Sequence, residues 1–139
     1  MHDIALFKEK IISLKDKVRG LNILVVDDEE LIRVKTGAFM EKFFDKVDCA
    51  KDGKDALKMF TGDTSYSIII TDLQMPYMTG EELIQELRAI DPDLFIVIMT
   101  GTPYSDDKLT QTYDICLEKP VDIDDMVQML EQLTQKKKL

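Results

Sequence analysis

Hydrophobic residues follow two different spacings along this chain. Unbroken apolar runs occupy residues 23–26, 68–70 and 94–99. Such runs are typical of strands that are buried on both faces of a sheet. Between the runs, apolar residues recur every three or four positions, as on one face of an amphipathic helix. This alternation predicts parallel strands joined by right-handed helical crossovers, and therefore a three-layer α/β sandwich.

The same pattern sets the limits of the individual elements. Strands are predicted at residues 21–27, 46–50, 66–72, 94–100 and 114–118, and helices at residues 29–44, 52–60, 79–90 and 122–138. Thr79 stands three residues before Glu82, which is a capping-box pattern, and Asp122 can cap the last helix. Helical spacing selects as buried positions Leu31, Val34, Ala38, Phe39 and Phe43, then Ala56, Leu57 and Phe60, then Leu83, Ile84, Leu87 and Ile90.

The stretch between the fourth and fifth strands departs from this pattern. Its sequence, "GTPYSDDKLTQTYDICLE", offers only Leu109 and Tyr104 as apolar anchors for a helix. Pro103 and the nearby Asp and Thr residues favour turns. We therefore expect the helix in this stretch to be short, mobile or both.

The first twenty residues form a segment of their own. Apolar residues at positions 4, 7, 11, 14 and 18 follow a 3-4-3-4 spacing, so on a helix they make one narrow seam. Residues 1–19 carry five basic and three acidic side chains, a net charge of +2, whereas the rest of the chain carries -11. Gly20 is a natural helix stop. We therefore divide the chain into an N-terminal amphipathic helix or linker, residues 1–20, and a globular domain, residues 21–139.

Three interpretations of this seam stay open. Residues 4–18 can pair with a second copy as a short coiled coil and so make a homodimer. Alternatively, the helix folds back onto its own domain, or it is the tail of a module upstream. The narrow, continuous seam slightly favours the dimer over the folded-back helix.

Composition and charge narrow the functional classes. The 139 residues are enough for one domain with a sizeable core, and the net charge of -9 argues against binding to nucleic acid or to an anionic membrane. The chain shows no apolar run long enough to span a bilayer and no signal peptide, so we expect a cytoplasmic protein. His2 is the only histidine, which argues against histidine chemistry within the domain. Cys49 and Cys116 lack metal-ligand spacing and are predicted to be reduced thiols.

Polar side chains follow four of the five predicted strands. Asp27 and Asp28 come after the first strand, Asp72 after the third, Thr100 after the fourth and Lys119 after the fifth. Because ligands of such folds bind outside the carboxyl ends of the strands, we expect these side chains to converge on one rim. Three carboxylates without histidine or thiolate suit Mg2+, and the lysine and hydroxyl suit a phosphoryl group. Asp72 is the best candidate nucleophile, which predicts an aspartyl phosphate.

Four motifs carry a resemblance to a known family. In order and spacing, "ILVVDDEE", "IIITDLQMPYMTG", "IVIMTG" and "CLEKP" resemble the receiver domain of two-component response regulators, of the kind found in chemotaxis regulators. The resemblance covers residues 21 to about 135. It implies a flavodoxin-like (βα)5 fold with strand order 2-1-3-4-5, here preceded by the N-terminal helix. It also implies phosphorylation by a histidine kinase or a histidine phosphotransfer protein.

The resemblance also implies a role for each site residue. By position, Asp72 resembles the phosphoacceptor, Thr100 the switch hydroxyl, and Lys119 the ammonium that pairs with the phosphoryl group. The implied magnesium ligands are Asp28, which binds directly, Asp27, which holds a metal-bound water, Asp72, and the backbone carbonyl of Gln74. The Lys119-Pro120 bond resembles one that is cis in the family. Side chains at Gln74 and Thr102 occupy positions that tune self-dephosphorylation there.

One switch position departs from the family pattern. The family usually has Tyr or Phe three residues before the lysine, and here that residue is Cys116. A compact thiol cannot act as a ring that moves between buried and exposed positions. Tyr113 and Tyr104 are nearby substitutes, although covering the sheet edge is the simpler role for both. For Cys116 a packing role outweighs a redox role.

The expected function is that of a phospho-accepting receiver in a phosphorelay, which passes information to a downstream protein by contact. It is not an ordinary enzyme, since it catalyses only its own phosphorylation and dephosphorylation. We expect no DNA-binding or catalytic output domain after the receiver. A haloacid-dehalogenase-like phosphatase is disfavoured because Gln74 stands where such enzymes need an acid. A receiver-like interaction module that is never phosphorylated is the main alternative, and the absent aromatic residue speaks for it.

Overall fold

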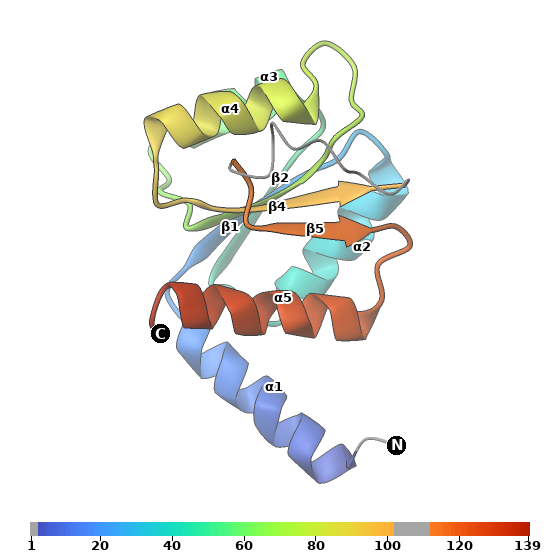
Figure 1. Ribbon diagram of the computed structural model, residues 1–139, viewed down its shortest axis with the longest axis vertical. Coiled ribbons are helices and arrows are strands. Elements are labelled where there is room, and N and C mark those ends of the chain that lie inside the picture. Colours follow the sequence, from blue (N-terminus) through green and yellow to red (C-terminus); the bar gives the residue numbers. More distant parts are fainter. Residues whose placement is uncertain (1–2, 102–111) are drawn as a thin grey trace.

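The computed structural model describes residues 3–101 and 112–139, which form one parallel five-stranded sheet with helices on both faces (Figure 1). The strands are β1 (Asn22–Val26), β2 (Lys46–Ala50), β3 (Ile68–Asp72), β4 (Phe95–Thr100) and β5 (Ile115–Glu118). The described helices are α1 (Ile4–Val18), α2 (Glu30–Met40), α3 (Gly53–Phe60), α4 (Gly80–Ile90) and α5 (Ile123–Lys136). The helix expected between β4 and β5, with Tyr104 and Leu109, falls outside the described residues.

The strand order is β2-β1-β3-β4-β5, which confirms the predicted flavodoxin-like topology. β1 pairs with β2 on one side and with β3 on the other, so the chain changes direction along the sheet at β1. The carboxyl ends of β1 and β3 therefore lie side by side. In open α/β sheets this is the place where ligands bind.

Two hydrophobic layers hold the helices to the sheet. Side chains alternate along each strand, so Ile23 and Val25 join the layer under α1, α2 and α5. Leu24 and Val26 join the layer under α3 and α4. In Figure 1 these two helix groups lie below and above the sheet. All residues of β3 and β4 are buried, as predicted for central strands covered on both faces.

The sequence patterns at the starts of α4 and α5 predicted their N-terminal caps correctly. The Thr79 hydroxyl accepts a hydrogen bond from the backbone N–H of Glu82, 3.2 Å away, and the Glu82 carboxylate accepts one from the N–H of Thr79. Asp122 caps α5 by accepting from the N–H of Asp125 at 2.8 Å. These bonds satisfy backbone donors that the first turn of a helix leaves without a partner.

The predicted buried face of α2 was only partly right: Phe43, just after the helix, is buried and Phe39 packs against the core, as predicted. Leu31 and Val34 are 67% and 57% exposed, while Thr36 and Gly37 face the sheet. The reason is close packing: a Cβ added to Gly37 would lie 3.0 Å from the Cys49 Sγ atom on β2. A small residue is needed where α2 crosses β2, and Leu31, Val34 and Ala38 lie on the outward side of the helix. Ile90 of α4, also expected inside, is 53% exposed.

At the amino ends of the strands, Arg88 of α4 connects several elements. Its guanidinium donates to the carbonyl oxygens of Pro92, Leu94 and Thr112 and to the Asp114 carboxylate, at 2.7 to 3.2 Å. Asp114 in turn accepts from the backbone N–H of Ile96. The end of α4 is thus fastened to the starts of β4 and β5.

The N-terminal helix folds back, in part, onto its own domain. Leu14 and Val18 are 3% and 0% exposed and belong to the core layer with α5, and Phe7 and Ile11 pack against that layer. The Lys10 ammonium lies 3.2 Å from the Glu131 carboxylate of α5. Ile4 is 72% exposed, on the half of α1 that extends past α5 in Figure 1. The preference for a dimer along the whole seam is therefore corrected, because two of the five seam residues are buried within the monomer.

Replacing Leu14 with alanine is expected to lower the free energy of unfolding by roughly 2 to 4 kcal/mol, since it removes a buried side chain and leaves a cavity. Ile12→Ala, on the same helix at 61% exposure, provides the matched control and should change it by less than about 0.5 kcal/mol. Urea denaturation measures both. Equal effects would mean that α1 does not pack on α5 in solution.

No helix within residues 3–101 and 112–139 has the length and apolar character needed to cross a bilayer.

Candidate functional site

Three aspartates gather at the carboxyl ends of β1 and β3. One carboxylate oxygen from each of Asp27, Asp28 and Asp72 lies within 4.8 Å of the other two. Asp27 and Asp72 are 0% and 6% exposed, whereas Asp28 faces solvent. The predicted convergence of these residues is therefore observed. Two buried carboxylates and one exposed carboxylate make a strongly negative rim that is open on one side.

Lys119 balances part of this charge. Its ammonium lies 3.2 Å from an oxygen of Asp27 and 3.2 Å from an oxygen of Asp72. The side chain is only 16% exposed, and the two carboxylates hold the lysine pKa above its usual range although burial alone would lower it. Lys119 therefore remains a cation beside Asp72. Its backbone N–H donates to the carbonyl of Thr100 at 2.7 Å, which joins the ends of β4 and β5.

Asp27 is fixed in place by its neighbours in the sequence. The backbone N–H of Glu29 donates to its carboxylate at 2.9 Å, and the Arg33 guanidinium donates to its backbone carbonyl at 2.9 Å. Burial raises the pKa of Asp27, while the hydrogen bond from the Glu29 N–H and the charge and hydrogen bond of Lys119 act to lower it. Sequence reasoning missed Arg33, which lies about one turn into the following helix and carries no motif of its own.

The loop after Asp72 positions its carboxylate. One carboxylate oxygen accepts from the backbone N–H of Gln74 at 3.3 Å, while the other faces Lys119. The N–H of Gly80 donates to the carbonyl of Leu73 at 3.0 Å. A Cβ added to Gly80 would lie only 2.2 Å from the Asp72 carbonyl oxygen. Glycine therefore lets α4 begin directly against the end of β3.

Tyr77, in the same loop, has an uncommon backbone conformation. Its φ angle is 69°, in the left-handed region that bulky residues avoid, and its side chain is 82% exposed. The ammonium of Lys54 lies 5.9 Å from the ring centroid. The sequence carries no signal for this conformation, because the residue is neither Gly nor Asn.

The remaining predicted site residues lie on the adjoining strands. Thr100 ends β4 and is 4% exposed, so its hydroxyl-bearing side chain sits at the buried edge of the rim. Cys116 lies on β5 with its thiol exposed, which corrects the expected packing role. Partial burial, and then the charge of Glu118, raise the pKa of this thiol, so it is not an activated thiolate. Tyr113 packs against the layer under α3 and α4, as a residue covering the sheet edge would. Thr102 falls outside the described residues.

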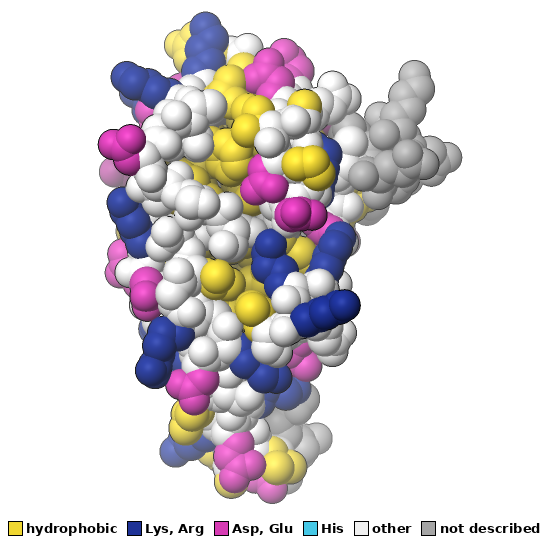
Figure 2. Space-filling view, turned by 90° about the vertical axis from the view of Figure 1, so that its left-hand side faces the viewer, with side chains coloured by type: hydrophobic (Ala, Val, Ile, Leu, Met, Phe, Trp, Pro, Cys, Tyr) yellow, Lys and Arg dark blue, Asp and Glu magenta, His cyan; other side chains and the backbone are white. Residues whose placement is uncertain are grey.

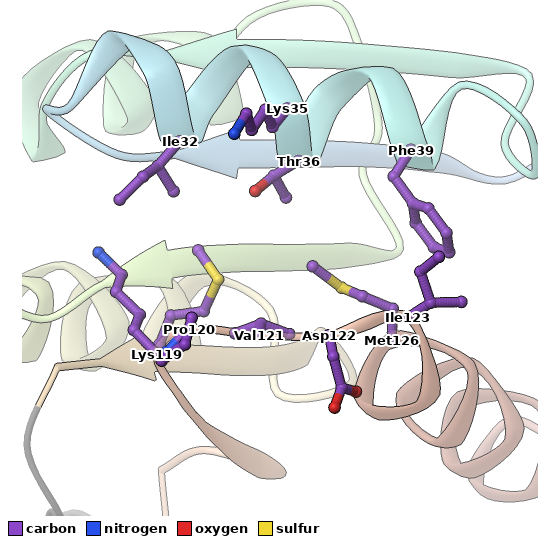
Figure 3. A pocket seen from close by; sticks show the side chains of 11 residues that line it. Ile32, Lys35, Thr36, Phe39, Lys119, Pro120, Val121, Asp122, Ile123 and Met126 are labelled. Carbon is purple, nitrogen blue, oxygen red and sulfur yellow. The ribbon is translucent and has the colours of Figure 1, made fainter.

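A cavity adjoins the site on the α2 side. The Lys119-Pro120 peptide bond is cis, as expected, and the chain that follows it forms one wall. The cavity, of about 510 Å³, lies between α2 and the start of α5. Figure 3 shows Ile32 opposite Lys119 at one end and Phe39 opposite Ile123 at the other. Lys119 thus borders both the acidic rim and this largely apolar space.

The donor set of the rim suits a divalent metal. Carboxylate oxygens are hard ligands, and histidine and thiolate are absent from the cluster of Asp27, Asp28 and Asp72. The pairing of two of these carboxylates with a lysine also suits a phosphoryl group, whose oxygens need a nearby cation.

Comparison with known proteins agrees with this geometry. Residues 23–131 match the profile of the response regulator receiver domain, so the chain belongs to the family of receiver domains of two-component systems. It is 33% identical over 118 residues to the aerobic respiration control sensor protein ArcB of Escherichia coli K12. It is 30% identical over 102 residues to the two-component response regulator ORR42 of rice.

Solved structures show the same fold. The response regulator receiver domain protein of Clostridium thermocellum superposes with a TM-score of 0.76 at 28% identity, covering 85% of this chain and 97% of that one. The response regulator TrrA of Thermotoga maritima, in complex with Mg2+ and BeF, superposes with a TM-score of 0.71 at 31% identity, covering 81% and 98%.

The relatives differ greatly in length. The match covers 81% of this chain but only 15% of ArcB, and 72% of this chain and 77% of ORR42. A rice protein named probable histidine kinase 4 is matched over 7% of its length. The similarity to the sensor proteins is therefore confined to one domain of each.

Proposed function

We propose that this chain is a phospho-accepting receiver of a phosphorelay, in which Asp72 takes a phosphoryl group from a phosphohistidine and thereby changes the contacts of the domain with other proteins. The observation that carries this proposal is the placement of the Asp72 carboxylate, with one oxygen 3.2 Å from the Lys119 ammonium and with Asp27 and Asp28 beside it. Membership of the receiver family supports the same conclusion.

The transfer is a displacement at phosphorus. A carboxylate oxygen of Asp72 forms the new O–P bond while the N–P bond to the donor imidazole breaks, and the imidazole nitrogen leaves with the electron pair. The Gln74 N–H holds one oxygen of Asp72, and Lys119 stabilises the negative charge that accumulates on the phosphoryl oxygens. The reaction needs no internal histidine in the acceptor.

Mg2+ fits the donor set, and Asp27, Asp28, Asp72 and the Gln74 carbonyl would hold it. When bound, it supplies positive charge that offsets the carboxylates and the transferred group. Thr100 and Lys119 would contact the phosphoryl oxygens, and the hydrogen bond between their backbones couples their positions. Cys116 occupies the position where an aromatic switch would stand, so the output signal has to leave by another route.

The partner that delivers the phosphoryl group must cover the rim. Exposed apolar side chains near it are Leu31 and Val34 on α2 and Ile123 at the start of α5. These residues offer a docking surface for the histidine kinase or histidine phosphotransfer protein, because a phosphohistidine in contact with Asp72 brings its own helix over them.

We propose a downstream protein as target, no nucleic acid or membrane as partner, and the cytoplasm as location. A homodimer through α1 would use Ile4 and its exposed neighbours.

The alternative function, an interaction module that is never phosphorylated, keeps one observation in its favour, the thiol of Cys116 at the switch position. The proposed chemistry is confined to the domain's own phosphorylation and dephosphorylation.

The decisive test is the intact mass of the protein after incubation with acetyl phosphate. A gain of one phosphoryl group that requires Mg2+ and disappears with a chelator is the expected result. Absence of any gain, with acetyl phosphate and with a panel of phosphorylated histidine kinases, would favour the interaction module.

Asp28→Ala is expected to weaken Mg2+ binding by at least about tenfold, since an exposed carboxylate ligand is lost while the buried pair with Lys119 stays. Titration calorimetry measures the affinity. Glu30→Ala, which removes a nearby exposed carboxylate outside the cluster, is the matched control and should leave the affinity within about twofold. An unchanged affinity in Asp28→Ala would mean that the metal binds elsewhere.

A further inference from the structure

A second surface depression lies between α3 and α4, on the face opposite α2 and α5. It has a volume of about 560 Å³, and its apolar lining comes from Leu57, Met78, Ala89 and Ile90. Ile90 is 53% exposed, which is unusual for an isoleucine that the helical pattern placed inside. Figure 2 shows hydrophobic side chains gathered in a strip near the top of the molecule, where these two helices lie. We call this depression the α3–α4 groove.

The two walls of the groove carry opposite charge. Lys54 and Lys58 line it from α3, and Glu86 lines it from α4. Within the described part of the chain, none of these three side chains forms an ion pair. The protein as a whole has a net charge of -9, so two neighbouring lysines that have no ion-pair partner among the described residues are a local exception beside an exposed apolar strip. A ligand with carboxylates along one edge would complement the α3 wall.

The groove is physically continuous with the phosphoacceptor loop. Met78, which lies six residues after Asp72, lines the groove and packs on the first residue of α3: a Cβ added to Gly53 would lie 2.9 Å from the Met78 Cβ. Tyr77, with its left-handed backbone, places its ring 5.9 Å from the Lys54 ammonium on the groove wall. A displacement of the loop that follows Asp72 would therefore change both the apolar lining and the basic wall.

We propose that the α3–α4 groove is a docking site for an amphipathic helix of a partner protein, with an apolar stripe that fills the groove and carboxylates along the edge that faces α3. Lys54 and Lys58 are one turn apart on α3, about 6 Å along the axis, which matches carboxylates on successive turns of a bound helix. Phosphorylation changes the affinity through Tyr77 and Met78; this regulation rests on the proposed function, whereas the groove itself does not. The groove thus gives the receiver an output surface that needs no aromatic residue at Cys116.

The test uses a synthetic amphipathic peptide of about 15 residues with leucine on one face, glutamate on one flank and glutamine on the other. Two-dimensional NMR of the full chain should show shifts confined to α3, α4 and residues 77–78, and the affinity should change when BeF and Mg2+ are added. The double variant Lys54→Glu with Lys58→Glu should bind roughly tenfold more weakly. Lys8→Glu with Lys15→Glu on α1 makes the same change of charge and should bind as the native protein does.

The results separate the groove from the receiver chemistry. Shifts that map to another surface, equal binding of a peptide with lysine in place of glutamate, or no binding at all would overturn the proposal. Circular dichroism verifies that both double variants are folded. The acetyl phosphate mass gain is measured on the same preparation. A phosphorylated protein whose peptide affinity does not change overturns the regulation alone. The absence of a mass gain overturns the proposed function, while the NMR shifts that the peptide causes in the unphosphorylated protein still test the groove as a docking site.

Discussion

Asp72→Asn should abolish the mass gain from acetyl phosphate while the fold stays intact. The amide lacks the nucleophilic oxygen charge but has nearly the same shape, and its oxygen can still accept from the Gln74 N–H. Lys119 keeps its second partner, Asp27, so no buried charge loses its only partner. The native protein and the variant are compared by intact mass and thermal unfolding.

Two controls sharpen this prediction. Hydroxylamine should remove the phosphoryl group from the native protein, because it cleaves an acyl phosphate and leaves phosphoserine and phosphothreonine untouched. Undiminished labelling of Asp72→Asn would move the acceptor to Asp27 or Asp28, the other carboxylates of the cluster. A large loss of thermal stability would show instead that the carboxylate is structural.

Gly80→Ala should destabilise the fold by about 3 kcal/mol and slow phosphorylation sharply. The added Cβ would meet backbone atoms, 2.2 Å from the Asp72 carbonyl oxygen and 2.7 Å from the Leu73 Cα, so no side chain can move aside. The start of α4 must withdraw from β3, which displaces the acceptor loop. Without this clash alanine would stabilise α4, since it is the better helix former. Urea denaturation and the acetyl phosphate reaction measure the two effects.

Gly101 supplies the matched control for this substitution. It also follows a strand end at the rim, but a Cβ added there meets no atom of residues 3–101 and 112–139 within 4 Å. Gly101→Ala should therefore change stability by less than about 0.5 kcal/mol. If both alanine variants were equally stable, the close contact between α4 and β3 would be absent in solution.

Much of the fold was predictable because its central strands carry the strongest possible sequence signal. The continuous apolar runs that became β3 and β4 fit a sheet covered on both faces better than one half exposed to water, and alternation with helices then restricts the topology to a few solutions. The site followed from the topology, since Asp27, Asp28 and Asp72 had to meet where β1 and β3 end together. Caps were predictable because their bonds are local, as at Thr79.

What escaped prediction depends on contacts between distant residues. The inward face of α2 is decided by the approach of Gly37 to Cys49 on β2, and spacing within the helix contains no record of that approach. The two halves of the α1 seam have different environments only because α5 covers one of them. Tyr77 escaped for another reason: its left-handed backbone is imposed by the loop against the preference of the residue.

The Arg88 hub has a mechanical consequence for the whole domain. Because the guanidinium uses all five of its N–H groups, to three carbonyls and one carboxylate, a lysine could not replace it. These hydrogen bonds hold the end of α4 against the amino ends of β4 and β5. A displacement at the carboxyl ends of the strands, where Asp72 lies, must then be taken up by the short loops at that end of the sheet. Those loops are the parts of the domain that a partner protein can touch.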